Sequence, residues 1–260
     1  MTTDPLAPLL ELADVAPAAQ QARERFDEAL GHRALRRHGG QVAAEVSLRS
    51  AVASAALEGY AYDREAVRAG TVTDPVLQGA LRVAGALPGL IELWPKAPRQ
   101  ALARLHVLAA RDVVPESELG RPITERVHQV DVVASAAAGL GARLDNLAAL
   151  VAGGTRVSPL VLAAVVHGEL LALRPFAGPS GVVARGAARL VLLASGTDPR
   201  GLLPVDVGHH EREPEYVGSA GAFATGTPDG LRSWLRHYMR AVEVGADELT
   251  RIGDEVLAAS

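Results

Sequence analysis

The residues best placed to do chemistry lie in one stretch, LALRPFAGPSGVVARGAARLVLLAS, at positions 171–195. Gly181 stands where a helix is expected to begin, and Arg174, Arg185 and Arg189 lie close to it in the chain. The free N–H groups at the start of a helix attract anions, and Arg185 and Arg189, four residues apart, share one helical face. The stretch therefore suits a pocket for a phosphate or a carboxylate, or surface arginines on an ordinary helix.

Two helices are expected to flank this stretch, over 158–173 and 181–195, and Ser158 followed by Pro159 is a good N-cap and first-turn pair. Helical periodicity dominates elsewhere, and no run alternates as a strand would. The other expected elements are helices over 18–38, stopped by Gly39 and Gly40, over 41–59, over 75–94 with an interruption at Pro88, over 98–112, over 123–152 as one helix or two, and over 229–257, with a loop-rich region at 196–215. The predicted fold class is all-α.

The composition narrows the class of protein. The chain has 260 residues, of which 48% are hydrophobic and only 3% aromatic, so the core must be mainly aliphatic. The absence of cysteine excludes disulfides, thiolate catalysis and cysteine-ligated metals. The net charge of −4 argues against nucleic acid as a partner. No stretch is long and apolar enough to span a membrane, and no basic start precedes the first apolar residues, so we expect a soluble cytoplasmic protein.

The loop resembles a known motif. The segment LRPFAGPSGVVAR is similar to the signature H-P-F-x-[D/E]-G-N-G-R-x-x-R of the Fic (Fido) family of AMP-transferring enzymes, and the matching positions are Pro175, Phe176, Gly181 and Arg185. His167, seven residues before Arg174, resembles a histidine of the helix that precedes the family motif. With HHEREPEYVGSAG and LRSWLRHYMRAVE downstream, the resemblance covers roughly 98–250. It implies a Fic-like helical bundle.

A second resemblance lies upstream, in the segment SAALEG at 54–59. It is similar to the inhibitory motif [S/T]-x-x-x-E-[G/N] that one class of the family carries before its core. The resemblance implies that Glu58 pairs with Arg185 and blocks the place of the nucleotide γ-phosphate. By pattern alone, the same segment is the C-terminus of a helix capped by glycine. We therefore expect an N-terminal helical region over 1–97, containing the inhibitory-type helix 41–59, and a Fic-like core over 98–260.

The departures from the motif fall on the residues that carry the reaction. The family's histidine base is Arg174 here, and a guanidinium cannot take up a proton. The acidic residue that holds Mg²⁺ is Gly178, which offers no carboxylate. The next glycine is Pro179, the asparagine is Ser180, and the first arginine is Val182. These replacements imply that conventional AMP transfer is lost.

Three histidines are further candidates for a catalytic base or a metal ligand. His167 lies two turns, roughly 10 Å, from Arg174 along a helix, and is expected to be structural rather than a substitute base. His209 and His210, followed by Glu211, do not share a helix face and are not expected to bind a metal. The segment 113–130, where the family has a target-docking hairpin, lacks a paired-strand pattern.

The sequence therefore predicts a catalytically inactive Fic-like pseudoenzyme that binds a nucleotide or other phosphate ligand, or serves as a protein-interaction module. The predicted ligand-binding residues are Arg174, Ser180, Gly181 and Arg185, with no catalytic residue and no metal ligand. ATP is a possible ligand but no cofactor is expected, and the partner is an unidentified protein or a second copy of the chain. The alternative is a divergent nucleotidyl or phosphocholine-type transferase that uses the substituted residues.

Overall fold

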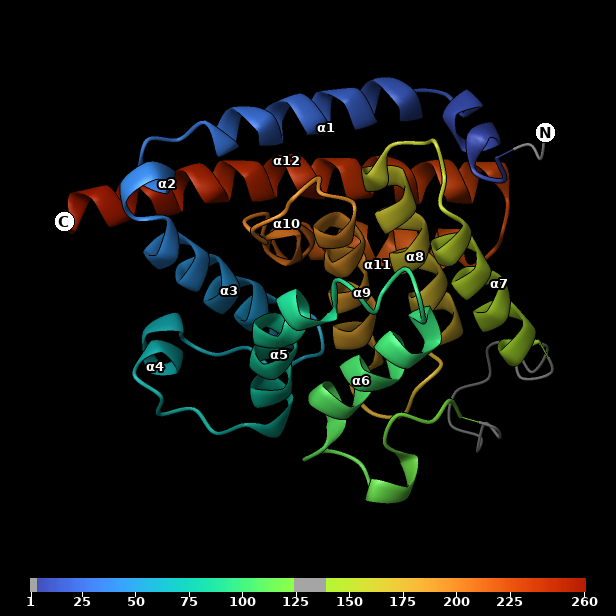
Figure 1. Cartoon of the computed structure of the whole chain (residues 1–260), viewed down its shortest axis with the longest axis horizontal. Helices are drawn as coiled ribbons and strands as arrows, with labels where there is room; N and C mark the ends of the chain where they lie inside the picture. Colours follow the sequence, from blue (N-terminus) through green and yellow to red (C-terminus); the bar gives the residue numbers. More distant parts are fainter. Residues whose placement is uncertain (1–3, 124–138) are drawn as a thin grey trace.

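The computed structural model describes residues 4–123 and 139–260. This part of the chain forms twelve α-helices and three 3-10 turns, without a strand, as Figure 1 shows. The helices are α1 (Val15–Leu30), α2 (Ala34–Arg37), α3 (Gly39–Ala56), α4 (Arg64–Arg68), α5 (Pro75–Ala86), α6 (Pro98–Ala110), α7 (Leu140–Gly153), α8 (Pro159–Leu173), α9 (Ser180–Ala194), α10 (Val205–Glu211), α11 (Glu213–Phe223) and α12 (Pro228–Ala258). The 3-10 turns cover Ala7–Glu11, Leu87–Leu90 and Glu116–Glu118. The all-α prediction is confirmed.

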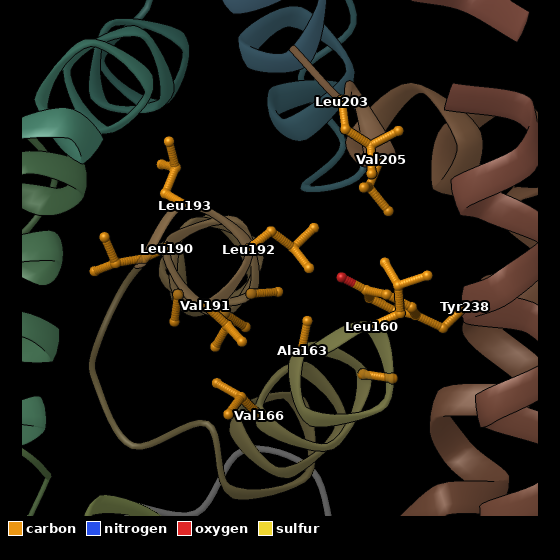
Figure 2. Packing of buried hydrophobic residues seen from close by; sticks show 14 of the residues in the cluster. Leu160, Ala163, Val166, Leu190, Val191, Leu192, Leu193, Leu203, Val205 and Tyr238 are labelled. Carbon is orange, nitrogen blue, oxygen red and sulfur yellow. The ribbon is translucent and has the colours of Figure 1, made fainter. Parts of the chain in front are cut away.

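Helix α9 is the centre of the fold. Its residues from Ser180 to Leu193 are all buried, because α9 packs against α8, α6, α5 and α3. In Figure 2 the side chains of Leu190 to Leu193 leave this helix on different sides and meet other buried residues such as Val166. A helix that is apolar all round belongs in a core, and the arginines on α9 are therefore carried into the interior with it.

The close packing around α9 depends on small residues. A Cβ at Gly186 would lie 2.7 Å from Val83 Cγ1 of α5, so these two helices meet where α9 has no side chain. Gly208 of α10 likewise lets the chain lie directly against the Ala241 backbone of α12. Alanine and glycine allow helices to approach closely, which explains how a core with few aromatic residues can be well filled.

The longest helix, α12, runs beside α1 in the same direction (Figure 1). Polar pairs mark this alignment at three levels, between Asp14 and Arg232 at 2.8 Å, between Arg25 and Asp247 at 2.6 Å, and between His32 and Asp254 at 3.2 Å. The hydrophobic core includes residues from both predicted regions, 1–97 and 98–260. The N-terminal helices are thus part of the same packed body as the core, and the boundary at 97 stays a prediction.

Most predicted helix ends agree with the structure for the expected reasons. The Ser158 Oγ accepts a hydrogen bond from Leu160 N at the start of α8, as an N-cap should. Asp74 caps α5 in the same way. The regular part of α5 ends at Ala86, and the chain continues as a 3-10 turn through Pro88, so the predicted interruption is confirmed. No described helix is long and apolar enough to cross a membrane.

Two predicted segments are wrong. The single helix expected over 18–38 is two helices, since α1 ends at Leu30 and α2 starts at Ala34. Gly39 and Gly40 do not stop a helix but begin α3. The loop-rich region 196–215 contains α10 and the start of α11, which pack on α12. Tertiary packing overrides weak local propensity in both cases. Of the helix expected over 123–152, the part at 124–138 lies outside the described residues.

Candidate functional site

The loop between α8 and α9 turns sharply at two positions. Arg174, just after α8, has φ +43°, and Gly178 has φ +70°. Between them, the Phe176 ring is buried and stacks on His106 of α6 with ring centres 4.6 Å apart. The loop is therefore clamped by one aromatic contact, while its two left-handed residues allow the chain to reverse into α9.

His106 of α6 holds this loop in place by a hydrogen bond to Ala177. It was not identified from the sequence. Its Nδ1 accepts a hydrogen bond from Gly120 N at 3.0 Å, so its Nε2 carries the hydrogen and donates to Ala177 O at 2.9 Å. Burial lowers the pKa of His106, in keeping with a neutral ring. His106 lies on the same apolar face of α6 as Leu102 and Leu105. This face was the sequence signal for its burial.

The positions that differ from the Fic motif have distinct environments. Arg174 is exposed and forms no ion pair with any residue that the structure describes. Val182 is buried among apolar side chains. A Cβ at Gly178 would lie 2.9 Å from Val114 Cγ1, so an acidic side chain has neither the backbone conformation nor the space there. Ser180 is buried, and its Oγ has no hydrogen-bond partner among the described residues.

Arg185 is the most highly bonded side chain of the site, and it is only 2% exposed. Its Nε donates to Ser54 Oγ at 2.8 Å, and its Nη2 donates to Ser54 O at 2.8 Å. Its Nη2 also donates to Glu58 Oε1 at 2.7 Å, and its Nη1 donates to the Tyr216 hydroxyl at 3.1 Å. Each nitrogen of the guanidinium is thus bonded to another residue of the chain.

The end of α3 holds Glu58 in this position. After Ala56 the chain makes a turn in which Gly59 has φ +91° and Tyr60 N donates to Ala55 O at 3.0 Å. This is the glycine-capped helix end that the pattern predicts, and the same turn places the carboxylate of Glu58 against Arg185. The structure therefore shows both the glycine-capped helix end and the pairing of Glu58 with Arg185, and the inhibitory role of this pair stays a prediction.

Glu58 also covers the start of α9. A Cβ on Gly181 would overlap with Glu58 Oε1 and would lie 3.1 Å from Glu58 Cδ. The carboxylate rests directly on the glycine, at the helix terminus where an anion is favoured. The structure thus brings Ser180, Gly181, Arg185 and Glu58 together, while Arg174 does not take part.

A second carboxylate lies behind Arg185 and was not predicted. Asp206, in the first turn of α10, is buried, with its Oδ1 3.8 Å from Arg185 Nε and its Oδ2 3.9 Å from Arg189 Nη1. The small space that these three side chains share with Tyr238 and His167 has no room for a water molecule. The interior therefore holds two arginines and two carboxylates in one cluster.

His167 lies on the other side of Tyr216 and is fully buried. Its Nε2 is 3.1 Å from the Tyr216 hydroxyl, the same hydroxyl that accepts a hydrogen bond from Arg185. Burial, together with the charge of Arg185, lowers the pKa of His167 well below its ordinary value. His167 packs edge-on against Trp234, as expected of a structural histidine.

The adjacent histidines point to different environments. His209 is buried, with its Nδ1 3.0 Å from His237 Nε2, whereas His210 and Glu211 are exposed. No group of side chains suited to a metal ion occurs among the described residues. The described part of the segment 113–130, up to 123, holds a 3-10 turn and no strand.

Comparison with solved structures identifies the fold. The chain is similar to a Fic family protein from Desulfovibrio desulfuricans G20, with a TM-score of 0.69 and 23% identity over 89% of this chain and 74% of that one. It is also similar to a fragment of Fic-1 from C. elegans, with a TM-score of 0.70 and 19% identity over 94% and 74% of the two chains. A Fic domain containing signaling protein from Bacteroides thetaiotaomicron gives 0.58 and 13% over 92% and 98%.

The class of protein defined by the architecture is therefore an all-α protein with the Fic fold. No protein-family model matches the sequence, and no curated protein matches it. At these identities the similarity establishes the fold, and the chemistry has to be argued from the side chains of this chain.

Proposed function

We propose that this chain is a catalytically inactive protein of the Fic fold, a pseudoenzyme that acts by binding. The observation that carries the proposal is the state of Arg185. Among the described residues its guanidinium donates hydrogen bonds only to Ser54, Glu58 and Tyr216, and Glu58 covers the start of α9 where a phosphate would be held. A site in which the cation and the helix terminus are both satisfied internally has no vacant anion contact.

The absence of a suitable base supports this proposal. Transfer of AMP to a hydroxyl requires removal of a proton, and a missing general base typically costs about 10²–10⁴ in rate. Arg174 stands at the position of the family's histidine and cannot accept a proton. His106 uses both ring nitrogens to hold the loop, and His167 is enclosed between Tyr216 and Trp234.

The metal requirement of the reaction points the same way. The fold family implies Mg²⁺ beside the nucleotide, held by an acidic side chain of the loop. The residues present do not fit this ion, because Gly178 has no side chain and Val114 lies over the place where one would start. Mg²⁺ needs oxygen ligands in a well-defined geometry. The proposed function therefore includes no metal-dependent step.

Two modes of binding are open to such a protein. With Glu58 in place, we propose a protein-interaction role, with another protein or a second copy of the chain as partner. With Glu58 displaced, Ser180, Gly181 and Arg185 could hold an anionic ligand without reaction, for which the sequence predicts a nucleotide or another phosphate. In both modes Glu58 determines whether the anion site is open.

One observation favours the alternative function, a divergent AMP transferase. An inert site has no need of a closing group, yet Glu58 and Arg185 form an ion pair at 2.7 Å. A chain that keeps this pair while its reaction is lost must use it for stability or for control of binding. The two functions differ in one respect that can be measured, which is the consumption of ATP.

Release of pyrophosphate from ATP tests the proposal, because AMP transfer to any acceptor, water included, liberates it. We expect wild type and Glu58→Ala, with Mg²⁺ or Mn²⁺, to release no more pyrophosphate than Glu58→Ala/Arg185→Met, which lacks the remaining arginine of the motif. Release by Glu58→Ala that disappears in the double variant would support the transferase instead.

A further inference from the structure

The buried Asp206 belongs to no motif and is not used by the proposed closing pair. It enters the core from α10, which is held in place because Gly208 lies directly against the Ala241 backbone of α12. Its carboxylate is too far from Arg185 and Arg189, at 3.8 and 3.9 Å, for good hydrogen bonds, and its Oδ2 has no hydrogen-bond partner among the described residues. Asp206 therefore acts on the site mainly through its charge.

The charges of the cluster balance in the closed state. Arg185 and Arg189 contribute two positive charges, and Glu58 and Asp206 contribute two negative charges. Buried charges are tolerated where they are compensated by partners of opposite sign. When Glu58 leaves, two guanidinium groups and one carboxylate remain, so the open cluster has a net charge of +1.

We propose that Asp206 determines the charge of the ligand, so that the open site accepts a singly charged carboxylate and rejects doubly charged phosphate or sulfate. This inference rests on the proposed function, in which Glu58 closes an anion site that carries out no transfer. A carboxylate replaces the charge of Glu58 one for one. A dianion leaves one negative charge uncompensated in the interior, beside an arginine that already has the Asp206 carboxylate 3.8 Å from its Nε.

The neighbouring groups do not change this charge balance. The buried Asp198 acts on Arg189 through its charge, but Arg200 acts on Asp198 in the same way, so these two further charges cancel. His167 and His209, which line the same small space as Asp206, are buried against one another with ring centres 4.9 Å apart. Burial keeps the pKa of both rings well below the ordinary value, so neither adds a positive charge near neutral pH. The remaining lining groups, Tyr238, Val205 and Ala188, are uncharged.

The geometry of the contact also fits a carboxylate. Glu58 shows that an oxygen of a planar carboxylate can lie between Arg185 and the start of α9. Val182 supplies no second guanidinium, and Arg174 is exposed without an ion pair to the described residues. A phosphate group would have one arginine where the family motif provides two.

The test uses Glu58→Ala, which opens the space that the side chain occupies, with acetate and sulfate as probes. Binding is followed by the rise in melting temperature near neutral pH at matched ionic strength, with wild type as the control for general salt effects. We expect acetate to bind Glu58→Ala at least about tenfold more tightly than sulfate. Neither anion should stabilise wild type specifically.

The variant that tests the role of Asp206 is Glu58→Ala/Asp206→Asn, in which removal of the Asp206 charge raises the net charge of the open cluster to +2. We expect the order to reverse, with sulfate bound more tightly than acetate. Should this variant fail to fold by circular dichroism, Glu58→Ala/Arg189→Met provides the opposite change, to a net charge of zero, and should bind neither anion. Preference for sulfate in Glu58→Ala, or no reversal in a folded Asp206→Asn variant, would overturn the inference.

The two proposals fail in different ways. If Glu58→Ala transfers AMP, the proposed pseudoenzyme is wrong whatever anion it binds. If Glu58→Ala transfers nothing but prefers sulfate to acetate, the proposed function stands and the role of Asp206 is wrong.

Discussion

Glu58 and Gly181 meet at the point where the N-terminal helices touch the loop. The carboxylate lies so close to the glycine Cα that no side chain could be placed between them. Gly181, which we propose as an anion-binding residue of the open site, is here in contact with an internal carboxylate. The start of α9 therefore stabilises the closed form by holding Glu58.

This contact predicts the effect of Gly181→Ala. The new methyl group would push aside the Glu58 carboxylate and would lie 3.0 Å from Arg185 Nη1. We expect the free energy of unfolding, measured by urea denaturation, to fall by about 1–3 kcal/mol, as for other overpacked positions. Gly221→Ala in α11 is the matched control, because its Cβ would meet nothing within 4 Å and alanine is the better helix former.

A double-mutant cycle identifies the group that causes the loss of stability in Gly181→Ala. If Glu58 is the group displaced, Gly181→Ala should cost clearly less in the Glu58→Ala background. An equal cost in both backgrounds would show that the clash lies elsewhere.

The sequence predicted the site only in part. The types and spacing of Pro175, Phe176, Gly181 and Arg185 were sufficient to indicate the fold and the loop. Asp206 was missed because a single charged residue in a short helix carries no periodic signal, and His106 was missed although it shares the apolar face of α6 with Leu102 and Leu105. Their proximity to the loop depends on tertiary packing that propensities cannot report.

At the scale of elements, α3 is the helix that delivers Glu58, and its middle is fixed to α12. Arg49 of α3 is 4% exposed and donates to Glu248 of α12 at 2.7 Å and to Glu45 at 2.6 Å. It also pairs with Glu255, which is half exposed. The helix is therefore anchored well before its end, and the turn after Ala56 carries the carboxylate into the site.

This anchor predicts unequal effects of two variants. Arg49→Ala removes the interior partner of the buried Glu248 and leaves it the half-exposed Arg251, and we expect a loss of stability on the order of 3 kcal/mol. Glu255→Ala removes only the exposed partner and should cost less than about 1 kcal/mol. Urea denaturation of both variants gives the comparison, and similar losses for the two would contradict this view of the anchor.

The elements themselves were predictable where a cap or a periodic face was present, as at Ser158 and Pro88. They were not predictable where the chain is polar and the helices short. The region 196–215 has no amphipathic pattern, yet α10 forms because Pro204 directs it onto α12 and Gly208 permits the contact. Glycines at 39 and 40 suggested a stop, whereas the packing of α3 extends its first turn through them.

At the scale of the whole molecule, three buried histidines connect the helices around α12. His167 and His209 lie with ring centres 4.9 Å apart, and His209 and His237 lie with ring centres 5.2 Å apart. Burial lowers the pKa of all three histidines. The pKa of His237 falls to about 4, although the charge of Glu215 raises it. The folded protein therefore holds these rings neutral at pH values where the unfolded chain protonates them.

The sign of the resulting pH dependence follows from linkage. Below the unfolded value of about 6.5, the unfolded chain binds more protons than the folded one, so stability falls as the pH falls. We expect the loss to begin near pH 6.5 and to continue toward pH 4, with a slope of up to about 1.4 kcal/mol per pH unit for each histidine. Carboxylates with lowered pKa values, such as Glu45, add their loss only below about 4.5.

Urea denaturation between pH 7.5 and 5 measures this slope, and His237→Gln should reduce it. A free energy of unfolding that stays constant over this range would show that the three rings are not held neutral in the fold.

The central claim is that this Fic fold no longer transfers AMP, even when its closing group is removed. The most direct measurement is the incubation of Glu58→Ala with ATP labelled at the α-phosphate, divalent metal and a cell lysate, followed by separation of the proteins. The account predicts no labelled band beyond that of Glu58→Ala/Arg185→Met. A labelled band that requires Arg185 would contradict it, and would show that the substituted loop still carries out the reaction.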